Sequence, residues 1–235
     1  MIKQFFKRHF HFLIMLRAYF RYVYNTHIKV TKRSAYGYMS PNTIIEPPIF
    51  WTNQSLVYLD TCKIRRGMVL INSTGKFVVK KYSAIALNCT VVTGNHKPTV
   101  GVPHLVLGSA HINDTESDII VEEEVWIGMN CTLLCGAHIG RGAIIGACSM
   151  VNKEIPPYAV AVGSPARVIA SVFTIDEIIK HEESIYPEKE RFSRVFLEEL
   201  FATYFEGKKS IGLDNLSGDL EEIVRNKKAQ FGLVY

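Results

Sequence analysis

The feature that most constrains this chain is an aliphatic residue that recurs every six positions. From residue 127 onward the repeat occupies Ile127, Leu133, Ile139, Ile145 and Val151. Small residues lie four positions after the first four of them, at Cys131, Ala137, Ala143 and Ser149. An α-helix repeats about every 3.6 residues and a strand about every two, so a period of six fits neither. The period predicts a solenoid in which each hexad forms a short strand and a turn, and three hexads complete one triangular coil.

The same register extends upstream, with one interruption. Val79, Ile85 and Val91 are six residues apart, and the repeat resumes six residues before Ile127. Residues 97–116 lie between these two stretches and contain prolines and polar clusters but no repeat. We expect them to form a loop extruded from the solenoid, and long loops in compact folds are usually functional. Between residues 44 and 75 the pattern is ragged, which predicts irregular first coils whose register the sequence does not reveal.

Helical segments are expected on both sides of the solenoid. Residues 1–26 are predicted to form an N-terminal amphipathic helix, residues 27–170 the β-helix domain, and residues 171–235 a helical extension. Thr174 and Glu177 have the spacing of a capping box, which marks the start of a helix. We expect the C-terminal helices to close the end of the solenoid, which would otherwise expose unpaired strand edges.

An acidic run, Glu122-Glu123-Glu124, lies in the turn between the repeat positions Val121 and Ile127. Three consecutive like charges usually lie on a solvated face of a protein. The sequence therefore predicts an exposed acidic surface at these three positions.

The N-terminal segment is rich in aromatic and basic residues. Its longest uncharged stretch, residues 9–16, is far shorter than the roughly 20 residues that a membrane-spanning helix needs. A small-residue cleavage site does not follow it, which argues against a signal peptide. Apolar residues recur at helical steps, so residues 1–24 either lie on an anionic membrane surface or pack on the protein or a neighbouring subunit.

Cysteine usage and net charge narrow the protein class. Five cysteines at irregular spacing provide no disulfide framework, which indicates a protein of a reducing compartment, the cytoplasm. The alternative is a cytoplasmic protein that is bound peripherally to the inner face of the membrane. A formal net charge of +5 suits an anionic ligand such as a phosphorylated cofactor. Because this charge is modest, we do not expect a nucleic-acid partner.

Two segments resemble the hexapeptide-repeat acetyltransferases. They are IALNCTVVTGNH at residues 85–96 and the long segment from VWIG to GSPARVI at residues 125–169. The layout is closest to that of the sugar O-acetyltransferases of the maltose and galactoside type. This resemblance implies a mainly β fold, a left-handed parallel β-helix, assembled as a homotrimer with active sites in the clefts between subunits. It also implies acetyl-CoA as cosubstrate and a saccharide acceptor, and it requires no metal.

His96 is the expected general base. It lies at the mouth of the extruded loop and matches the family's catalytic histidine. An unperturbed imidazole, with a pKa of about 6.5, is suited to take a proton from a hydroxyl that attacks a thioester. Asn88 matches the family's acceptor-binding asparagine, although a corner asparagine that serves only the turn is the alternative. The loop also supplies groups that are candidates to orient His96: His104, His111, Asp114, Glu116 and Asp118.

Cofactor-binding residues are inferred from the same resemblance. Trp126 matches a position beside the pantetheine arm, or else packs under the loop or a helix. Gly128 and Ala147, at corners of successive coils, are candidates to present backbone groups to the pantetheine amides. Lys153 and Arg167 match basic positions near the adenosine phosphates, and exposed surface charges are the alternative.

The sequence favours an acetyl-CoA-dependent O-acetyltransferase acting on a sugar or polysaccharide-precursor hydroxyl. A xenobiotic acetyltransferase for antibiotics and an amino-sugar N-acetyltransferase of the same fold are alternatives. A γ-type carbonic anhydrase, with zinc on three histidines, and a non-catalytic β-helix scaffold are weaker alternatives.

Overall fold

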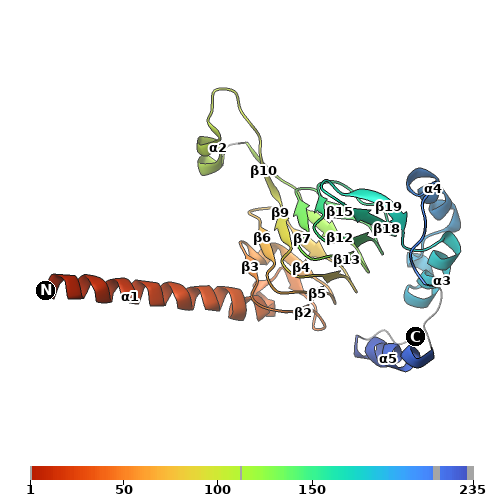
Figure 1. Cartoon of the computed structure of the whole chain (residues 1–235), viewed down its shortest axis with the longest axis horizontal. Helices are drawn as coiled ribbons and strands as arrows, with labels where there is room; N and C mark the ends of the chain where they lie inside the picture. Colours follow the sequence, from red (N-terminus) through yellow and green to blue (C-terminus); the bar gives the residue numbers. More distant parts are fainter. Residues whose placement is uncertain (1, 112, 214–217, 232–235) are drawn as a thin grey trace.

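The computed structural model describes residues 2–111, 113–213 and 218–231, and its body is a triangular β-solenoid of about six turns (Figure 1). Each coil contributes one short strand to each of three parallel sheets, which we name A, B and C. Sheet A contains β1 (Tyr38–Met39), β4 (Val57–Leu59), β7 (Phe77–Val79), β12 (Ile119–Val121) and β15 (His138–Ile139). Sheet B contains β2 (Ile44–Ile45), β5 (Lys63–Ile64), β8 (Ala84–Ile85), β13 (Trp126–Ile127), β16 (Ile144–Ile145), β18 (Ala159–Val162) and β19 (Arg167–Ser171). Sheet C contains β3 (Phe50–Trp51), β6 (Val69–Ile71), β9 (Thr90–Val92), β14 (Thr132–Leu134) and β17 (Met150–Val151).

The six-residue repeat forms the core, as predicted. Ile64, Ile85, Ile127 and Ile145 pair in successive strands of sheet B and are all fully buried. Equivalent columns run through sheets A and C, so each coil rests its three aliphatic residues on those of the next. Burial of such columns stabilises the stack by roughly 25 cal/mol for each Å² of apolar surface removed from water.

The ragged first coils have a definite register in the structure. Met39 pairs with Leu59, Ile45 with Ile64, and Trp51 with Leu70. Extra residues between the strands, including a 3₁₀ turn at Gln54–Leu56, shift the spacing away from six. The extra residues lie in the corners, so the strands still stack in register although the six-residue spacing is lost from the sequence.

The extruded segment is an ordered arm and not an irregular loop (Figure 1). It begins earlier than predicted, with β10 (Gly94–His96), and returns through β11 (Asp114–Glu116), which pairs antiparallel with β10. A short helix, α2 (His104–Ala110), lies near its tip. The strand pairing that places His96 opposite Asp114 has no signal in the six-residue pattern.

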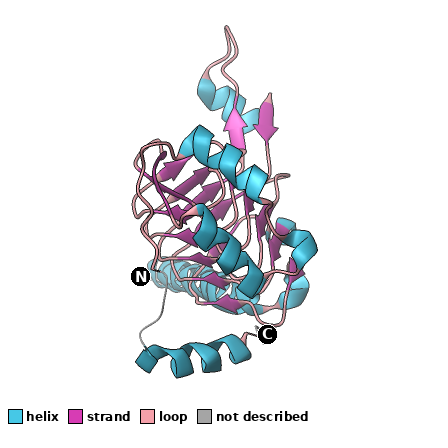
Figure 2. Cartoon of the chain, turned by 90° about the vertical axis from the view of Figure 1, so that its right-hand side faces the viewer, coloured by secondary structure: helices cyan, strands magenta, loops and turns pink. Residues whose placement is uncertain are grey.

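The first two C-terminal helices cover the last coil (Figure 2). Strand β19 first folds back antiparallel on β18, and the predicted capping box of Thr174 and Glu177 then starts α3 (Ile175–Ile185). A 3₁₀ turn at Glu188–Glu190 leads to α4 (Arg194–Tyr204), and α5 (Gly218–Gln230) follows. Ile178 and Leu197 are fully buried in the core, so α3 and α4 close this end of the solenoid, as expected.

The acidic run at residues 122–124 is not the solvated face that the sequence predicted. Glu122 contacts Lys80 at 2.5 Å and His138 at 2.9 Å, and each of the three carboxylate side chains is less than one fifth exposed. Glu124 accepts a hydrogen bond of 2.8 Å from the Tyr186 hydroxyl, which follows α3. The prediction was wrong because partners distant in sequence converge on sheet A, and a charge run alone does not reveal them.

Arg141 completes this network beside the C-terminal helices. Its guanidinium contacts Glu123 and the fully buried Glu182 of α3, and it lies over the rings of Tyr186 and Phe192. A buried charge is tolerated only when it is paired and hydrogen-bonded. The network therefore holds α3 against the solenoid.

The N-terminal segment forms a long helix, α1 (Ile2–Val23), that extends away from the first coil (Figure 1). A π-helical turn (Tyr24–Ile28) and 3₁₀ turns (Lys29–Thr31 and Arg33–Ala35) join it to the body. Thr26 and Val30 are buried at this junction, and Ile49 donates its backbone N–H to Thr26 at 3.0 Å. The alternative that the helix packs on its own solenoid is wrong, because the side chains from residue 11 to the end of α1 are almost all exposed.

Candidate active site

His96 is held in one orientation by a carboxylate of the arm. It ends β10, and its Nδ1 lies 2.5 Å from Oδ1 of Asp114 on the paired strand β11. A neutral imidazole that donates from Nδ1 keeps Nε2 unprotonated, which is the state that a general base needs. The imidazole is 58% exposed, so Nε2 is accessible to an acceptor molecule.

A second histidine contacts the same carboxylate. Nδ1 of His111 lies 2.8 Å from the other oxygen, Oδ2, of Asp114. Two hydrogen bonds hold the pKa of Asp114 below its ordinary value: the one from His96 has the larger effect, and the one from His111 adds to it. Asp114 therefore remains ionised and keeps accepting from both rings at neutral pH.

Glu116 fastens the arm to the neighbouring coil. Its Oε2 accepts the backbone N–H groups of Gly75 at 2.5 Å and Thr74 at 2.9 Å, and the Thr93 hydroxyl at 2.8 Å. Its Oε1 accepts the N–H of Ser73 at 3.0 Å. Partial burial alone would raise the pKa of Glu116, but these donors outweigh that effect and lower it. The carboxylate is thus a fixed anion at the base of the arm.

A pocket of about 120 Å³ lies beside these side chains. Its walls come from the outer faces of β6 and β9, from the 73–75 turn and from the base of the arm. The residues that line it are Ile71, Ser73, Val92, Gly94, Asn95, His96, His111, Asp114 and Glu116.

Asn88 does not reach this pocket within one chain. It lies in the corner between β8 and β9, whereas His96 lies beyond the other end of β9. Its φ of +59° is the left-handed conformation that asparagine tolerates, and its side-chain amide packs over Gly67 of the coil below. Asn88 is thus an exposed corner residue, on the edge of the solenoid between sheets B and C.

Of the residues predicted to meet the pantetheine arm, Gly128 and Ala147 lie near that same edge, and Trp126 lies on the outer face of sheet B. Gly128 and Ala147 stack on successive coils so closely that a Cβ on Gly128 would lie 2.5 Å from the Ala147 nitrogen. The Gly128 N–H donates to the Ile145 carbonyl at 2.8 Å and its carbonyl accepts from the Cys89 thiol at 3.2 Å, so both backbone groups already have partners within the chain. Trp126, two residues earlier, is 63% exposed, which contradicts the alternative that it packs under the loop or a helix.

The two predicted basic residues lie on different edges. Lys153 is exposed in the turn after β17, on the edge between sheets C and A where the arm also leaves the solenoid. Arg167 is exposed at the start of β19, and it donates to the carbonyl of its neighbour Ala166 at 3.0 Å. One chain therefore does not bring Lys153 and His96 together with Asn88, Trp126 and Gly128.

Sequence reasoning missed the 73–75 turn. Its backbone N–H groups bind Glu116 from more than 40 positions away, and the residues Ser-Thr-Gly carry no motif that predicts this contact. In the described parts of the chain, no group of three His, Cys, Asp or Glu side chains is placed to hold a metal ion.

Comparisons with known proteins agree with this architecture. The family model "Bacterial transferase hexapeptide (six repeats)" matches residues 118–153. A galactoside O-acetyltransferase of Lactococcus lactis is 28% identical over 138 residues, which are 58% of this chain and 63% of that protein. A chloramphenicol acetyltransferase of Klebsiella aerogenes is 42% identical over 59 residues, which are 25% of this chain and 28% of that protein. The chain thus matches less than two thirds of the length of these curated relatives.

A solved structure of a galactoside acetyltransferase in complex with coenzyme A has the same fold. It superimposes with a TM-score of 0.50 at 25% identity, over 65% of this chain and 70% of that chain. The solenoid and its repeat define a hexapeptide-repeat protein. The chain is similar to the hexapeptide-repeat acetyltransferases, and the family model covers its residues 118–153.

Proposed function

We propose that the protein transfers an acetyl group from acetyl-CoA to a hydroxyl of a saccharide, with His96 as the general base. The observation that supports this most directly is the His96–Asp114 contact of 2.5 Å beside an open pocket. Nε2 of His96 takes the hydroxyl proton as the oxygen attacks the thioester carbonyl carbon. The carbon–sulfur bond then breaks, and the imidazolium returns the proton to the leaving thiolate. Asp114 keeps the ring oriented and stabilises its charged form.

The proposed site needs two copies of the chain. His96 and Lys153 lie on the C–A edge, whereas Asn88 and Gly128 lie near the B–C edge and Trp126 lies on the outer face of sheet B. Only a neighbouring copy can place one edge against the other, as the homotrimer predicted from the sequence would. The outer face of sheet C, between the two edges, carries an apolar column of Ile71, Val92 and Leu134 that suits such an interface.

The assignment is tested by an acceptor screen with acetyl-CoA, in which release of free CoA thiol is followed. We expect His96→Ala to lower turnover by about 10²–10⁴-fold, the usual contribution of a general base. His104→Ala is the matched control, because this histidine lies on α2 of the same arm and is absent from the pocket lining. Full activity of His96→Ala on the best acceptor would refute the role of His96.

The identity of the acceptor is the finer part of the proposal. The galactoside acetyltransferase likeness supports a sugar hydroxyl. The shorter but more similar match to a chloramphenicol acetyltransferase supports an antibiotic hydroxyl as the second candidate. The screen therefore includes galactosides, maltose, amino sugars and chloramphenicol, and the highest kcat/KM decides among them.

Mixed oligomers test whether two copies build the site. His96→Ala and Asn88→Ala variants, each inactive alone, are unfolded together and refolded as a mixture. If each site combines His96 of one copy with Asn88 of the next, about a quarter of the sites in a random mixture contain both native residues. Recovery of about a quarter of wild-type activity is expected. Recovery of none would show that the two residues do not combine across copies, and an Asn88→Ala variant that is active alone would show that Asn88 is only a corner residue.

A further inference from the structure

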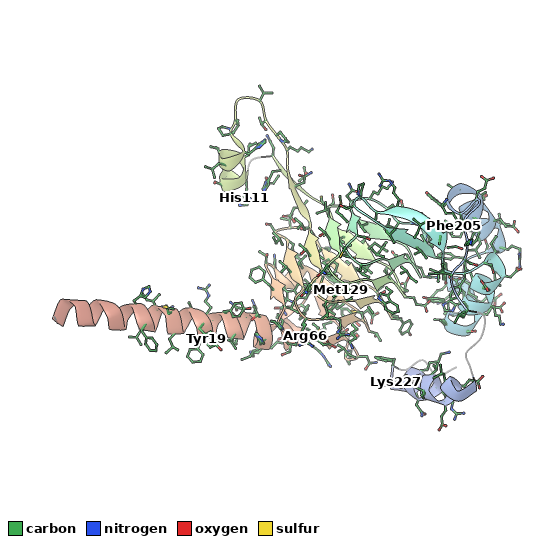
Figure 3. The ribbon with its side chains drawn as sticks, in the orientation of Figure 1. Tyr19, Arg66, His111, Met129, Phe205 and Lys227 are labelled. Carbon is green, nitrogen blue, oxygen red and sulfur yellow. The ribbon has the colours of Figure 1, made fainter. Side chains whose placement is uncertain are left out.

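The helix α1 presents an apolar face that the chain itself leaves uncovered. Phe12, Leu13, Leu16, Tyr19 and Phe20 are between 38% and 62% exposed. At about 100° per residue they occupy one side of the helix, while His11, Arg17, Ala18 and Arg21 occupy the other, with Ile14 and Tyr22 as the exceptions. Figure 3 shows Tyr19 on this helix, well away from the solenoid.

The segment that contains this helix has a charge unlike that of the rest of the chain. Residues 1–45 contain eight of the 27 Lys and Arg residues and no Asp or Glu, because Glu46 is the first acidic residue. Residues 46–235 contain all 22 acidic residues against 19 basic ones. Lys29, Lys32 and Arg33 are exposed at the base of the helix, so the positive charge continues onto the first coil.

We propose that α1 binds flat on an anionic lipid surface, with its Phe12–Phe20 face in the headgroup region. A helix of 22 residues is about 33 Å long, and an apolar face with aromatic residues beside Lys and Arg is the composition of an interfacial helix. Among the helices that the structure describes, none is long and apolar enough to cross a bilayer. The helix therefore lies on the membrane surface.

Charge favours lipid over a second copy as the partner of this face. Pairing two α1 helices would bring together segments that hold only positive charges, with no carboxylate on either to offset them. An anionic headgroup layer neutralises these charges and buries the aromatic side chains at the same time. This inference does not depend on which acceptor the enzyme uses.

The test is flotation of the full-length protein with vesicles. Vesicles of phosphatidylcholine alone are compared with vesicles containing about 30% phosphatidylglycerol. On the anionic vesicles, each Lys or Arg near the surface raises the affinity about fivefold. We expect strong binding only to the anionic vesicles, and weaker binding when salt rises from about 0.1 M to about 0.5 M. Equal binding to both kinds of vesicle, or binding to neither, would overturn the proposal.

Two pairs of variants separate the faces of the helix. Phe12→Ser with Phe20→Ser removes apolar area and is expected to weaken binding at least about tenfold. His11→Ser with Ala18→Ser, on the opposite face, is the matched control and is expected to bind as the wild type does. All four positions lie outside the buried core, so thermal unfolding of the solenoid serves as the check on folding.

Sedimentation of the same variants without vesicles tests the competing partner. We expect the oligomeric state to be the same for both variant pairs and the wild type. If the Phe12→Ser and Phe20→Ser pair instead dissociates an oligomer that the wild type forms, the apolar face joins copies of the chain, and the lipid proposal is wrong.

Discussion

Glu116 should control the stability of the arm that holds His96. Its carboxylate accepts hydrogen bonds from four donors, the N–H groups of Ser73, Thr74 and Gly75 and the Thr93 hydroxyl. Glu116→Gln keeps the size of the side chain, removes the charge and turns one acceptor oxygen into a donor. Hydrogen bonds to a charged group contribute about 1.5–3 kcal/mol each when buried, and partial exposure reduces this. We therefore expect a loss of about 2 kcal/mol for the whole contact.

The effect should be local, because the arm contributes little to the buried core of the solenoid. A loss of about 2 kcal/mol in the opening free energy corresponds to about thirtyfold faster amide exchange in β10 and β11. Hydrogen exchange read by mass spectrometry measures this, with the core strand β13 as the internal reference. The thermal midpoint of the whole protein should change far less.

Asp118→Asn is the matched control, because Asp118 accepts a single backbone hydrogen bond, from Lys76 at 2.8 Å. It lies just beyond the arm and is exposed, so we expect at most about a fivefold change in exchange. If Glu116→Gln leaves exchange of the arm unchanged, or if Asp118→Asn matches it, the view of Glu116 as the anchor of the arm is wrong.

The same contact predicts a pH dependence with a definite sign. The hydrogen bonds lower the pKa of Glu116 in the folded arm relative to its ordinary value of 4.5. The stabilisation is therefore complete above about pH 4.5 and is lost as pH falls towards the lower pKa of the folded state. Protection of the arm in the wild type should fall in this acidic range, and protection in Glu116→Gln should not change there.

Three further perturbations test other parts of the structure. Asp114→Asn should lower kcat much more than it raises KM and should shift the acidic limb of the pH–rate profile, because His96 loses the carboxylate that orients it; unchanged kcat would contradict this. Ile127→Ala should lower the free energy of unfolding by about 2–5 kcal/mol in denaturant titration, whereas the half-exposed Ile169→Ala should have little effect. Glu182→Gln leaves Arg141 without its buried carboxylate and should destabilise by about 3 kcal/mol, seen as a lower thermal midpoint; an unchanged midpoint would show that the network contributes no net stability.

Periodic features of this protein were readable from the sequence. The aliphatic repeat at Ile127, Leu133 and Ile139 predicted the solenoid, because stacking of identical coils imposes the same residue type at the same step. The capping box at Thr174 and Glu177 predicted the start of α3, because both hydrogen bonds form within four residues. The place of His96 at the edge of an extruded segment was readable for the same reason, since the interruption of a strict period is visible locally.

The contacts between residues that are distant in sequence were decided by the tertiary structure. Five side chains of the arm were candidates to orient His96, and only the strand pairing of β10 with β11 selects Asp114. The anchor of Glu116 on the 73–75 turn and the pairing of the acidic run at 122–124 depend on stacked coils and on the docking of α3, which join residues 16 to 62 positions apart in sequence. A sequence records residue types and short spacings, whereas a hydrogen bond depends on distance and direction in space, and in a solenoid the stacking of coils determines both.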